Sequence, residues 1–273
     1  ISTGNDNYNN RVFLGFSIIV LCVVGTTFLC SIFDPDFFWH LATGRWIVEN
    51  MNLPERDPFT PFFYGTNREA FIFAWGIGIA SVIWFALVIN LLSAVLSLIA
   101  ILFYVFVYTL GLKRRTPQNI VWGGAAGAMP AVIGWAAVTN ELSLSAWVLF
   151  LIIFLWTPPH YWPLSMRYLE EYKEAGVPML PVVAKNEKVG RQIILYAYAY
   201  FASTLLLIPV ADMGLVYVLA AVLSGVWFVW ESHRLYAEAK LTVPKNPMRL
   251  FHASITHLTI LFLAIAIDPL LHI

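Results

Sequence analysis

Charge is the property that this sequence has least of. Only 12% of its 273 residues are acidic or basic, against roughly 25% in soluble globular domains. The 16 basic and 16 acidic side chains give a net charge of zero, so the sequence shows no electrostatic footprint for binding nucleic acid. With 60% hydrophobic residues, this composition excludes an ordinary soluble domain and indicates an integral membrane protein.

Cysteine is also scarce. Cys22 and Cys30 are the only two, both within one apolar run, and no Cys-x-x-Cys or Cys/His cluster is present. We interpret both as small core residues rather than a redox pair or metal ligands. A cleavable signal peptide is not expected, because the first apolar run continues past the usual length and lacks a small-residue cleavage site.

Long apolar runs, by contrast, are abundant and predict the fold. A transmembrane helix requires about 20 consecutive apolar residues. By that measure the candidate spans are 12–33, 69–88, 90–110, 119–138, 143–160, 191–210, 213–231 and 250–269. The predicted fold class is therefore all-α integral membrane, a polytopic bundle of about eight transmembrane helices.

The basic residues predict how this bundle lies in the membrane. Short turns near Asn90, Asn140–Glu141 and Asp212–Gly214 join some neighbouring spans. Four longer connections join the others: 34–68, 111–118, 161–190 and 232–249. Of the 16 Lys and Arg residues, 15 lie in or beside these longer connections, and Arg11 is the exception. The positive-inside rule therefore places the longer connections together on the cytoplasmic face, or on the matrix face in an organelle.

The connection 111–118 carries a cluster of cations. Lys113, Arg114 and Arg115 follow one span, and Pro117 suits the first turn of the next helix. Such a cluster can bind a phosphate or diphosphate, Arg through bidentate hydrogen bonds and Lys as a point charge. The alternative is a topology anchor of the kind common at cytoplasmic helix ends, and taken alone the cluster favours the anchor.

The connection 161–190 carries an acidic cluster. Residues Arg167–Glu174 are expected to form a short interfacial helix that ends at Gly176. Glu170 and Glu174 share a face of that helix and would repel each other unless a cation lay between them. Mg²⁺ suits this position, because it takes one or two carboxylates and completes its shell with water and substrate phosphate oxygens. The alternative is a solvated helix held by an arginine–glutamate pair four residues apart.

The span 143–160 is expected to end at Thr157-Pro158-Pro159, which would place His160, Tyr161 and Trp162 at the membrane rim. The two aromatic residues match the ordinary aromatic belt of membrane proteins. A histidine at such a rim is more often a hydrogen-bonded interface residue than a ligand. These residues by themselves leave both interpretations open.

Three stretches together resemble a known family. They are YTLGLKRRTPQNIVWGGAAGAMPAVIGWAAVT, LFLIIFLWTPPHYW and EEYKEAGVPMLPVV. They resemble the protoheme IX farnesyltransferases (heme O synthases), a branch of the UbiA-type membrane prenyltransferases. The resemblance extends from about Arg68 to the C-terminus, roughly three quarters of the chain, and its long strings distinguish this branch from the quinone and chlorophyll prenyltransferases.

The resemblance also implies roles for individual residues. It implies catalysis by Glu170, Glu171 and Lys113. It implies substrate binding by Tyr108, Lys113, Arg114, Arg115, Asn119, His160, Tyr161, Arg167 and Tyr172, with His160 and Tyr161 facing heme. Mg²⁺ would be held by the pair Glu170 and Glu171 according to the family pattern, with Glu174 added from helix geometry.

The implied reaction is transfer of a farnesyl group from farnesyl diphosphate to a vinyl group of protoheme IX (heme b), giving heme O with Mg²⁺-assisted departure of diphosphate. The implied partners are farnesyl diphosphate, heme b and the lipid bilayer. Heme A synthase or other cytochrome oxidase assembly proteins are candidate protein partners. A bacterial inner membrane is favoured over a mitochondrial inner membrane, with the active-site loops on the cytoplasmic or matrix side.

Residues 1–67 depart from the family pattern. The family has a first acidic motif, N-x-x-x-D-x-x-x-D, and two helices before it, whereas this chain has room for one. Asn50 and Asn52 are followed at matching offsets by Pro54 and Arg56 instead of aspartate. The missing motif predicts impaired activity.

What stands there instead resembles the first extramembrane loop of polytopic lipid-dependent glycosyltransferases. Its Asp34-Pro-Asp36 could hold a metal, but residues two apart do not share a helical face, so we assign these aspartates only a weak claim on Mg²⁺. We hypothesise two parts, 1–67 as an atypical N-terminal helix and loop and 68–273 as the prenyltransferase-like domain. The junction, between about Pro58 and Arg68, would result from an in-frame fusion, a misassembled gene or a recombined pseudogene.

Other functions remain open at this point. The chain could be a UbiA-type transferase with a different aromatic acceptor, although the strings LWTPPHYW and GVPMLPVV argue against it. It could also be an inactive membrane protein or the product of a chimeric gene. A glycosyltransferase fragment is supported only by residues 12–67, a stretch too short to contain an acceptor site.

Overall fold

The computed structural model describes residues 67–241 and 244–271, whose regular structure is entirely helical. The elements are α3 (Asn67–Trp84), η2 (Phe85–Ile89), α4 (Leu91–Leu102), η3 (Phe103–Leu112), α5 (Asn119–Thr139), α6 (Leu144–Arg167), α7 (Leu169–Glu174), α8 (Leu180–Val183), α9 (Asn186–Val210), α10 (Leu215–Leu241) and α11 (Met248–Leu271). The span predicted at 12–33, the residues Asp34 and Asp36, and residues 58–66 of the hypothesised junction lie outside the described ranges.

Six of these helical segments are long and apolar enough to cross a membrane. They are Leu91–Leu112, Asn119–Thr139, Leu144–Arg167, Asn186–Val210, Leu215–Leu241 and Met248–Leu271. A shorter apolar helix, Ala74–Ile89, corresponds to the span predicted at 69–88. The all-α, polytopic membrane class is confirmed, and each predicted span after residue 68 corresponds to a helix. Several helices are longer than predicted, most of all α10, which continues past residue 231 to Leu241.

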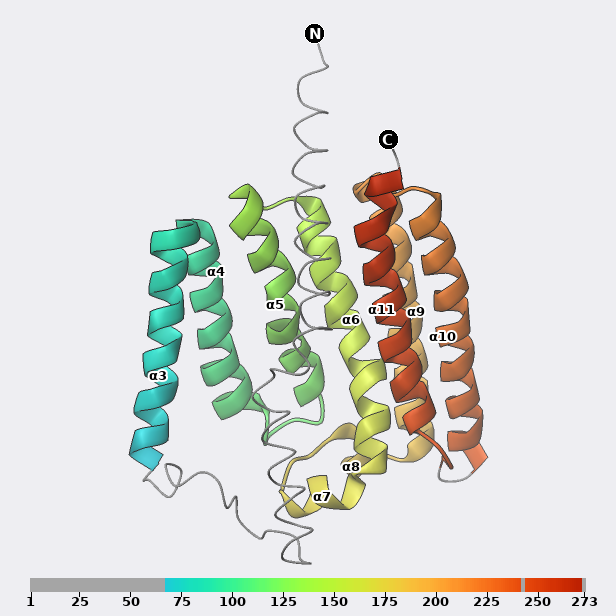
Figure 1. Ribbon diagram of the computed structural model, residues 1–273. Helices are drawn as coiled ribbons and strands as arrows, with labels where there is room; N and C mark the ends of the chain where they lie inside the picture. Colours follow the sequence, from blue (N-terminus) through green and yellow to red (C-terminus); the bar gives the residue numbers. More distant parts are fainter. Residues whose placement is uncertain (1–66, 242–243, 272–273) are drawn as a thin grey trace, which may run out of the picture.

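The helices run alternately up and down, so their connections gather at two ends (Figure 1). One end, here called the loop end, contains residues 113–118, the short helices α7 and α8, and residues 244–247. The opposite end, here called the turn end, contains the tight turns at Asn90, 140–143 and 211–214. The basic and acidic clusters therefore lie at the same end of the bundle, as the sequence predicted.

Side-chain caps fix the turn end. Asn90 caps α4 by accepting a hydrogen bond from Ser93 N–H (2.8 Å), while its amide donates to the carbonyl of Ala136 at the end of α5 (2.8 Å). The carboxylate of Asp268 on α11 accepts hydrogen bonds from the backbone N–H groups of Gly214 and Tyr217, where α10 begins. These groups have no partner within α10, so the buried aspartate satisfies them.

The main core lies between α6, α9, α10 and α11. Its largest fully buried side chains include Trp162, Tyr200, Tyr217 and Phe228, one or two from each of three helices. The Tyr217 hydroxyl donates to the backbone carbonyl of Thr204 (2.8 Å) and so joins α10 to α9. These four helices contain most of the buried hydrophobic side chains of the described residues.

The predicted end of a span at Thr157–Pro159 is wrong. α6 continues as one helix to Arg167 and includes Pro158, Pro159 and Pro163. A proline removes one N–H donor, but its fixed φ near −65° matches helical backbone. All three rings are buried in the bundle, so their packing offsets the missing hydrogen bonds. As a result His160 lies within the helix rather than beyond its end.

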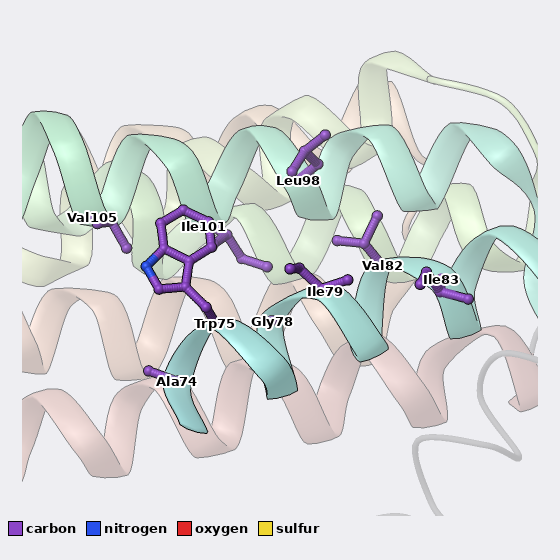
Figure 2. A pocket seen from close by; sticks show the side chains of 9 residues that line it. All are labelled: Ala74, Trp75, Gly78, Ile79, Val82, Ile83, Leu98, Ile101 and Val105. Atoms are coloured by element: carbon purple, nitrogen blue, oxygen red, sulfur yellow. The ribbon is translucent and has the colours of Figure 1, made fainter. Parts of the chain in front are cut away.

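An apolar groove of about 180 Å³ lies between α3 on one side and α4 with the start of η3 on the other (Figure 2). The residues that line it are Ala74, Trp75, Gly78, Ile79, Val82, Ile83, Leu98, Ile101 and Val105. Apart from the indole nitrogen of Trp75, their side chains are hydrocarbon, so the groove suits an alkyl or isoprenoid chain and carries no group for acid–base chemistry.

Candidate functional site

The basic loop is held by the π-helical turn before it and by an asparagine after it. Element η3 ends with the N–H of Lys113 donating to the carbonyl of Tyr108 (2.8 Å). Asn119, at the start of α5, is fully buried, and its amide donates to the carbonyl of Lys113 (3.0 Å). The buried Asn119 Oδ1 has no hydrogen-bond partner within the described residues. A buried acceptor of this kind is costly unless it receives a donor.

The cations of this loop are all at least partly accessible. Arg114 and Arg115 are exposed, and Lys113 is half-buried. Within residues 67–241 and 244–271, no ion pair joins this loop to the acidic cluster. Three positive charges are therefore available at the loop end for an anionic ligand.

The acidic cluster is on α7, as predicted, and Gly176 ends this short helix with a positive φ of 65°. An open hollow beside α7 is lined by Arg167, Leu169, Glu170, Glu171 and Glu174. The three carboxylates are exposed, and Glu170 lies 3.6 Å from the ammonium of Lys173. Because a break at residue 168 separates α6 from α7, the arginine and glutamate four residues apart do not lie on one continuous helix.

A small hydrophobic core joins the two clusters. Ile120, next to the basic loop, packs with Val177 and Met179, which follow α7. Tyr161 and Tyr172 pack against the same core. The N-terminus of α5 and the loop after α7 are thus held together by buried side chains, and the charged groups lie around this contact.

Three tyrosines gather at this core, from η3, α6 and α7. The Tyr172 hydroxyl donates to the Tyr161 hydroxyl across 3.5 Å, the long limit of a hydrogen bond. Burial, this hydrogen bond and the neighbouring phenols of Tyr161 and Tyr108 together raise the pKa of Tyr172 above its ordinary value. Tyr108 lies against α5, where a Cβ at Gly123 would come within 2.8 Å of its ring.

Oxygen ligands for a metal are present here but are spread apart. Within the described ranges, no group of three or more His, Cys, Asp or Glu residues is gathered closely enough to hold a metal ion. The three glutamates of the α7 hollow still supply the oxygen donors that Mg²⁺ prefers. Since Mg²⁺ usually keeps several waters and substrate oxygens, one or two of these carboxylates would suffice.

His160 faces away from this cluster, toward α11. Its ring stacks between Trp156 (centroid distance 3.9 Å) and Phe251 (4.6 Å), and its Nδ1 lies 2.7 Å from Ser254 Oγ. Its centroid is 6.4 Å from that of Tyr161. The sequence pointed to His160 but not to its three partners, and only the spacing of Trp156 four residues earlier on the same helix could have suggested one of them.

The structure thus brings together most of the residues that the sequence proposed. Those that lie at the loop end, on the ends of η3, α5 and α6, on α7 and in the 113–118 loop, are Tyr108, Lys113, Arg114, Arg115, Asn119, Tyr161, Arg167, Glu170, Glu171, Tyr172 and Glu174. His160 is separate, on the α11 side of α6. The guanidinium of Arg167 lies over the ring of Tyr168, 5.9 Å from its centroid.

The fold and the loop end together define the class of this protein. It is a polytopic membrane protein with cations, carboxylates and buried aromatic side chains at one end of the bundle. The sequence profile of the UbiA prenyltransferase family matches residues 65–255. The chain belongs to this family and is a membrane prenyltransferase.

Similar proteins identify a narrower group. The protein named protoheme IX farnesyltransferase of Clavibacter michiganensis is 64% identical over 206 residues, 76% of this chain and 67% of that protein. The protein of the same name from Leifsonia xyli is 59% identical over the same share of each chain. That of Paenarthrobacter aurescens is 55% identical over 266 residues, 96% of this chain and 81% of its own length. No solved structure matches the chain.

Proposed function

We propose that this protein transfers the farnesyl group of farnesyl diphosphate to a vinyl group of protoheme IX, giving heme O. The observation that carries this proposal is identity of 55–64% to proteins named protoheme IX farnesyltransferase. The site supports it independently, because cations, carboxylates and aromatic rings surround one contact at the loop end. A diphosphate needs the charged groups, and an isoprenoid cation needs the aromatic ones.

Lys113, Arg114 and Arg115 would bind the diphosphate. They lie on one short loop, and no described carboxylate is paired with them. Arginine binds phosphate oxygens through two parallel hydrogen bonds, and lysine contributes a point charge. Asn119 fixes the loop through its contact with the Lys113 carbonyl, which leaves the cations at a defined place without an internal partner. This arrangement favours an anionic ligand over a simple topology anchor.

Mg²⁺, held by Glu170 and Glu171 with Glu174 beside them, would neutralise the negative charge that develops on the departing diphosphate. The protein supplies the carboxylates on a helix exposed at the loop end, and Lys173 lies near Glu170 as a further cation. Mg²⁺ on α7 and the cations of the 113–115 loop would then stabilise the same diphosphate from two different elements.

The reaction proposed at this site balances as follows. The bond between farnesyl C1 and the diphosphate oxygen breaks, and its electron pair leaves with diphosphate. The vinyl π electrons of protoheme IX then form a bond to the allylic cation, and water adds to the resulting cation and loses a proton to complete a hydroxyethylfarnesyl group. The neighbouring rings of Tyr108, Tyr161 and Tyr172 would shelter such cations, because each aromatic face can stabilise a cation by about 0.5–2 kcal/mol.

The loop end is proposed to face the cytoplasm of a bacterium. The basic residues of the longer connections lie at this end, and the positive-inside rule places them on the cytoplasmic side. Farnesyl diphosphate, a charged metabolite of the cytoplasm, would then reach the site directly. Heme A synthase and other cytochrome oxidase assembly proteins are proposed protein partners.

The test is production of heme O in a bacterial strain that lacks it, followed by mass spectrometry of extracted hemes. We expect the wild-type chain to yield farnesylated heme and Glu171→Gln to yield at least about 10-fold less, since it removes a ligand of the Mg²⁺ that would neutralise the departing diphosphate. Glu187→Gln changes an exposed glutamate at the same end, in the first turn of α9, and should leave the yield unchanged. Absence of any farnesylated heme from the wild-type chain would overturn the proposal.

A further inference from the structure

The element before the basic loop is π-helical over ten residues. Element η3 continues directly from α4 and ends at Leu112. At its end the Lys113 N–H donates to the carbonyl of Tyr108, five residues earlier (2.8 Å). Such turns are rare, mostly occur singly and are frequent at functional sites. A run of this length, placed immediately before three cations, therefore needs a physical cause.

Two asparagine side chains hold α4 and η3 against α5, one at each end. At the turn end, the Asn90 amide donates to the carbonyls of Ala136 and Ala137 (2.8 and 3.2 Å). These carbonyls belong to the last turn of α5, whose carbonyls have no partner of the α-helical pattern. At the loop end, the Asn119 amide donates to the carbonyl of Lys113 (3.0 Å). Between these two contacts, α4 and η3 both pack along α5 (Figure 1).

The two stretches that join these contacts have unequal numbers of residues. Asn90 and Lys113 are 23 residues apart, whereas Asn119 and Ala136 are 17 residues apart. As continuous α-helices, these stretches would rise about 35 Å and about 26 Å, respectively. A π-helical turn holds more residues than an α-helical turn, so η3 covers less length per residue. The winding of η3 thus takes up part of the surplus residues between the two contacts.

The winding of η3 also determines which way Tyr108 faces. Tyr108 is the buried residue of η3, and its ring lies beside that of Tyr104 (centroid distance 5.4 Å). On the α5 side, a Cβ at Gly123 would come within 2.8 Å of the same ring. An α-helix turns further about its axis and rises further with each residue than a π-helix does. Rewinding η3 as an α-helix would therefore rotate Tyr108 away from α5 and displace Lys113 along the helix axis.

We propose that Asn90, at the turn end, is a positioning residue for the diphosphate site at the opposite end of the bundle. Together with Asn119 it holds α4 and η3 in the register that places Tyr108 and Lys113 in that site. This inference rests on the proposed function. When the contact of Asn90 with α5 is lost, α4 can shift along α5, and η3 can rewind into the commoner α-helix.

Asn90→Asp separates this role from capping. The aspartate keeps the oxygen that accepts from the Ser93 N–H at the start of α4, but it has no amide hydrogens to donate to α5. Asn90→Ser is a second test, because it keeps a capping oxygen on a shorter side chain and adds no charge. Ser143→Ala is the matched control. It removes the cap of α6 at the same end, a hydrogen bond from the Ala146 N–H (3.2 Å).

The first measurement is equilibrium binding of farnesyl diphosphate with Mg²⁺ to the full-length chain in lipid nanodiscs. We expect binding about 10-fold or more weaker in Asn90→Asp and Asn90→Ser, since a misplacement of about 1 Å caused by a distant substitution can cost about 100-fold in catalysis. Ser143→Ala should bind as the wild type does. Thermal unfolding of each variant controls for folding.

The second measurement follows η3 itself by pulsed electron paramagnetic resonance. Nitroxides are attached to Leu110→Cys in η3 and Leu223→Cys in α10, two exposed positions, in a chain whose Cys22 and Cys30 are replaced by serine. The distance between the nitroxides should shift in both Asn90 variants, because η3 moves along its axis. It should stay at the wild-type value in the control variant.

Unchanged farnesyl diphosphate affinity in both Asn90 variants would overturn this inference even if the wild type makes heme O. Weaker binding with an unchanged nitroxide distance would overturn it too, because η3 would not have moved. Weaker binding together with a displaced η3, in a protein that never farnesylates heme, would support the inference and refute the proposed reaction. Absence of farnesyl diphosphate binding by the wild type would refute both.

Discussion

The charged side chains at the loop end differ in burial and in contacts. Lys113 is half-buried and its backbone is fixed from both sides, whereas Glu170 is exposed and is near one lysine. We predict that Lys113→Ala weakens binding of Mg²⁺–farnesyl diphosphate about 10-fold or more, since a hydrogen bond to a charged group contributes roughly 1.5–3 kcal/mol. Glu170→Ala should also weaken saturable binding strongly, because it removes a metal ligand, although Glu171 and Glu174 remain beside the hollow.

The measurement is equilibrium binding of labelled farnesyl diphosphate with Mg²⁺ present. Two exposed residues at the same end serve as controls, Lys185→Ala and Glu187→Ala, which change charge in the same way and lie away from the α7 hollow. Unchanged affinity in both Lys113→Ala and Glu170→Ala would remove this site assignment.

At the scale of an element, α5 sets the place of Tyr108. A methyl group at Gly123 would lie 2.8 Å from the Tyr108 ring, so the ring must move, whereas one at Gly127 on the same helix meets nothing within 4 Å. We predict that Gly123→Ala lowers heme O formation several-fold through displacement of this ring. Gly127→Ala should leave it unchanged and should stabilise the helix by up to about 1 kcal/mol.

Steady-state kinetics with purified protein distinguish the two variants, because a displaced ring at the isoprenoid site raises KM or lowers kcat without unfolding the protein. Equal rates in Gly123→Ala and Gly127→Ala would show that Tyr108 does not line the site.

The start of α10 depends on one residue of α11. Asp268→Ala removes two hydrogen bonds to backbone N–H groups and leaves these donors buried, which should lower the free energy of unfolding by about 1–3 kcal/mol. Asp212→Asn changes an exposed acid in the same turn and keeps a residue that tolerates its φ of 50°, so it should have little effect. Thermal unfolding in detergent measures both, and equal melting temperatures would contradict the cap.

The sequence predicted the transmembrane helices well, because their positions follow from apolar composition alone. Apolar runs of about 20 residues define spans, and the polar residues Asn90, Asn140 and Asp212 marked the turns. It failed at α6, where Pro158 and Pro159 suggested an end, because proline is tolerated when its ring is buried in a bundle. The helices are apolar around their whole circumference, so periodicity does not show which face is inward. The contact of His160 with Ser254, 94 residues away, therefore needed the structure.

At the scale of the whole molecule, we predict that the N-terminal segment limits the activity of the enzyme. The first acidic motif of the family is missing from residues 1–67, and the fusion junction near Pro58–Arg68 remains a prediction. We predict that replacing residues 1–67 with the corresponding segment of the Clavibacter protein raises heme O yield in the heme O-deficient strain, because a second set of carboxylates would share the Mg²⁺–diphosphate charge. Equal yield from the two chains would show that the native segment is sufficient. A long sequencing read showing one uninterrupted gene with this loop would overturn the fusion.

The proposed diphosphate site depends on the orientation of the bundle in the membrane. Cations and carboxylates from separate connections can bind one diphosphate only if these connections lie on the same side. The alternation of helices places residues 113–118 and α7 at one end and the turns at 140–143 and 211–214 at the other. We predict that Arg114→Cys and Glu174→Cys, in a chain whose Cys22 and Cys30 are replaced by serine, react with an impermeant maleimide only in inside-out membrane vesicles. Asp212→Cys should react only in right-side-out vesicles. Labelling of Arg114→Cys and Glu174→Cys from opposite sides would exclude a shared diphosphate site, whatever the identity to known farnesyltransferases.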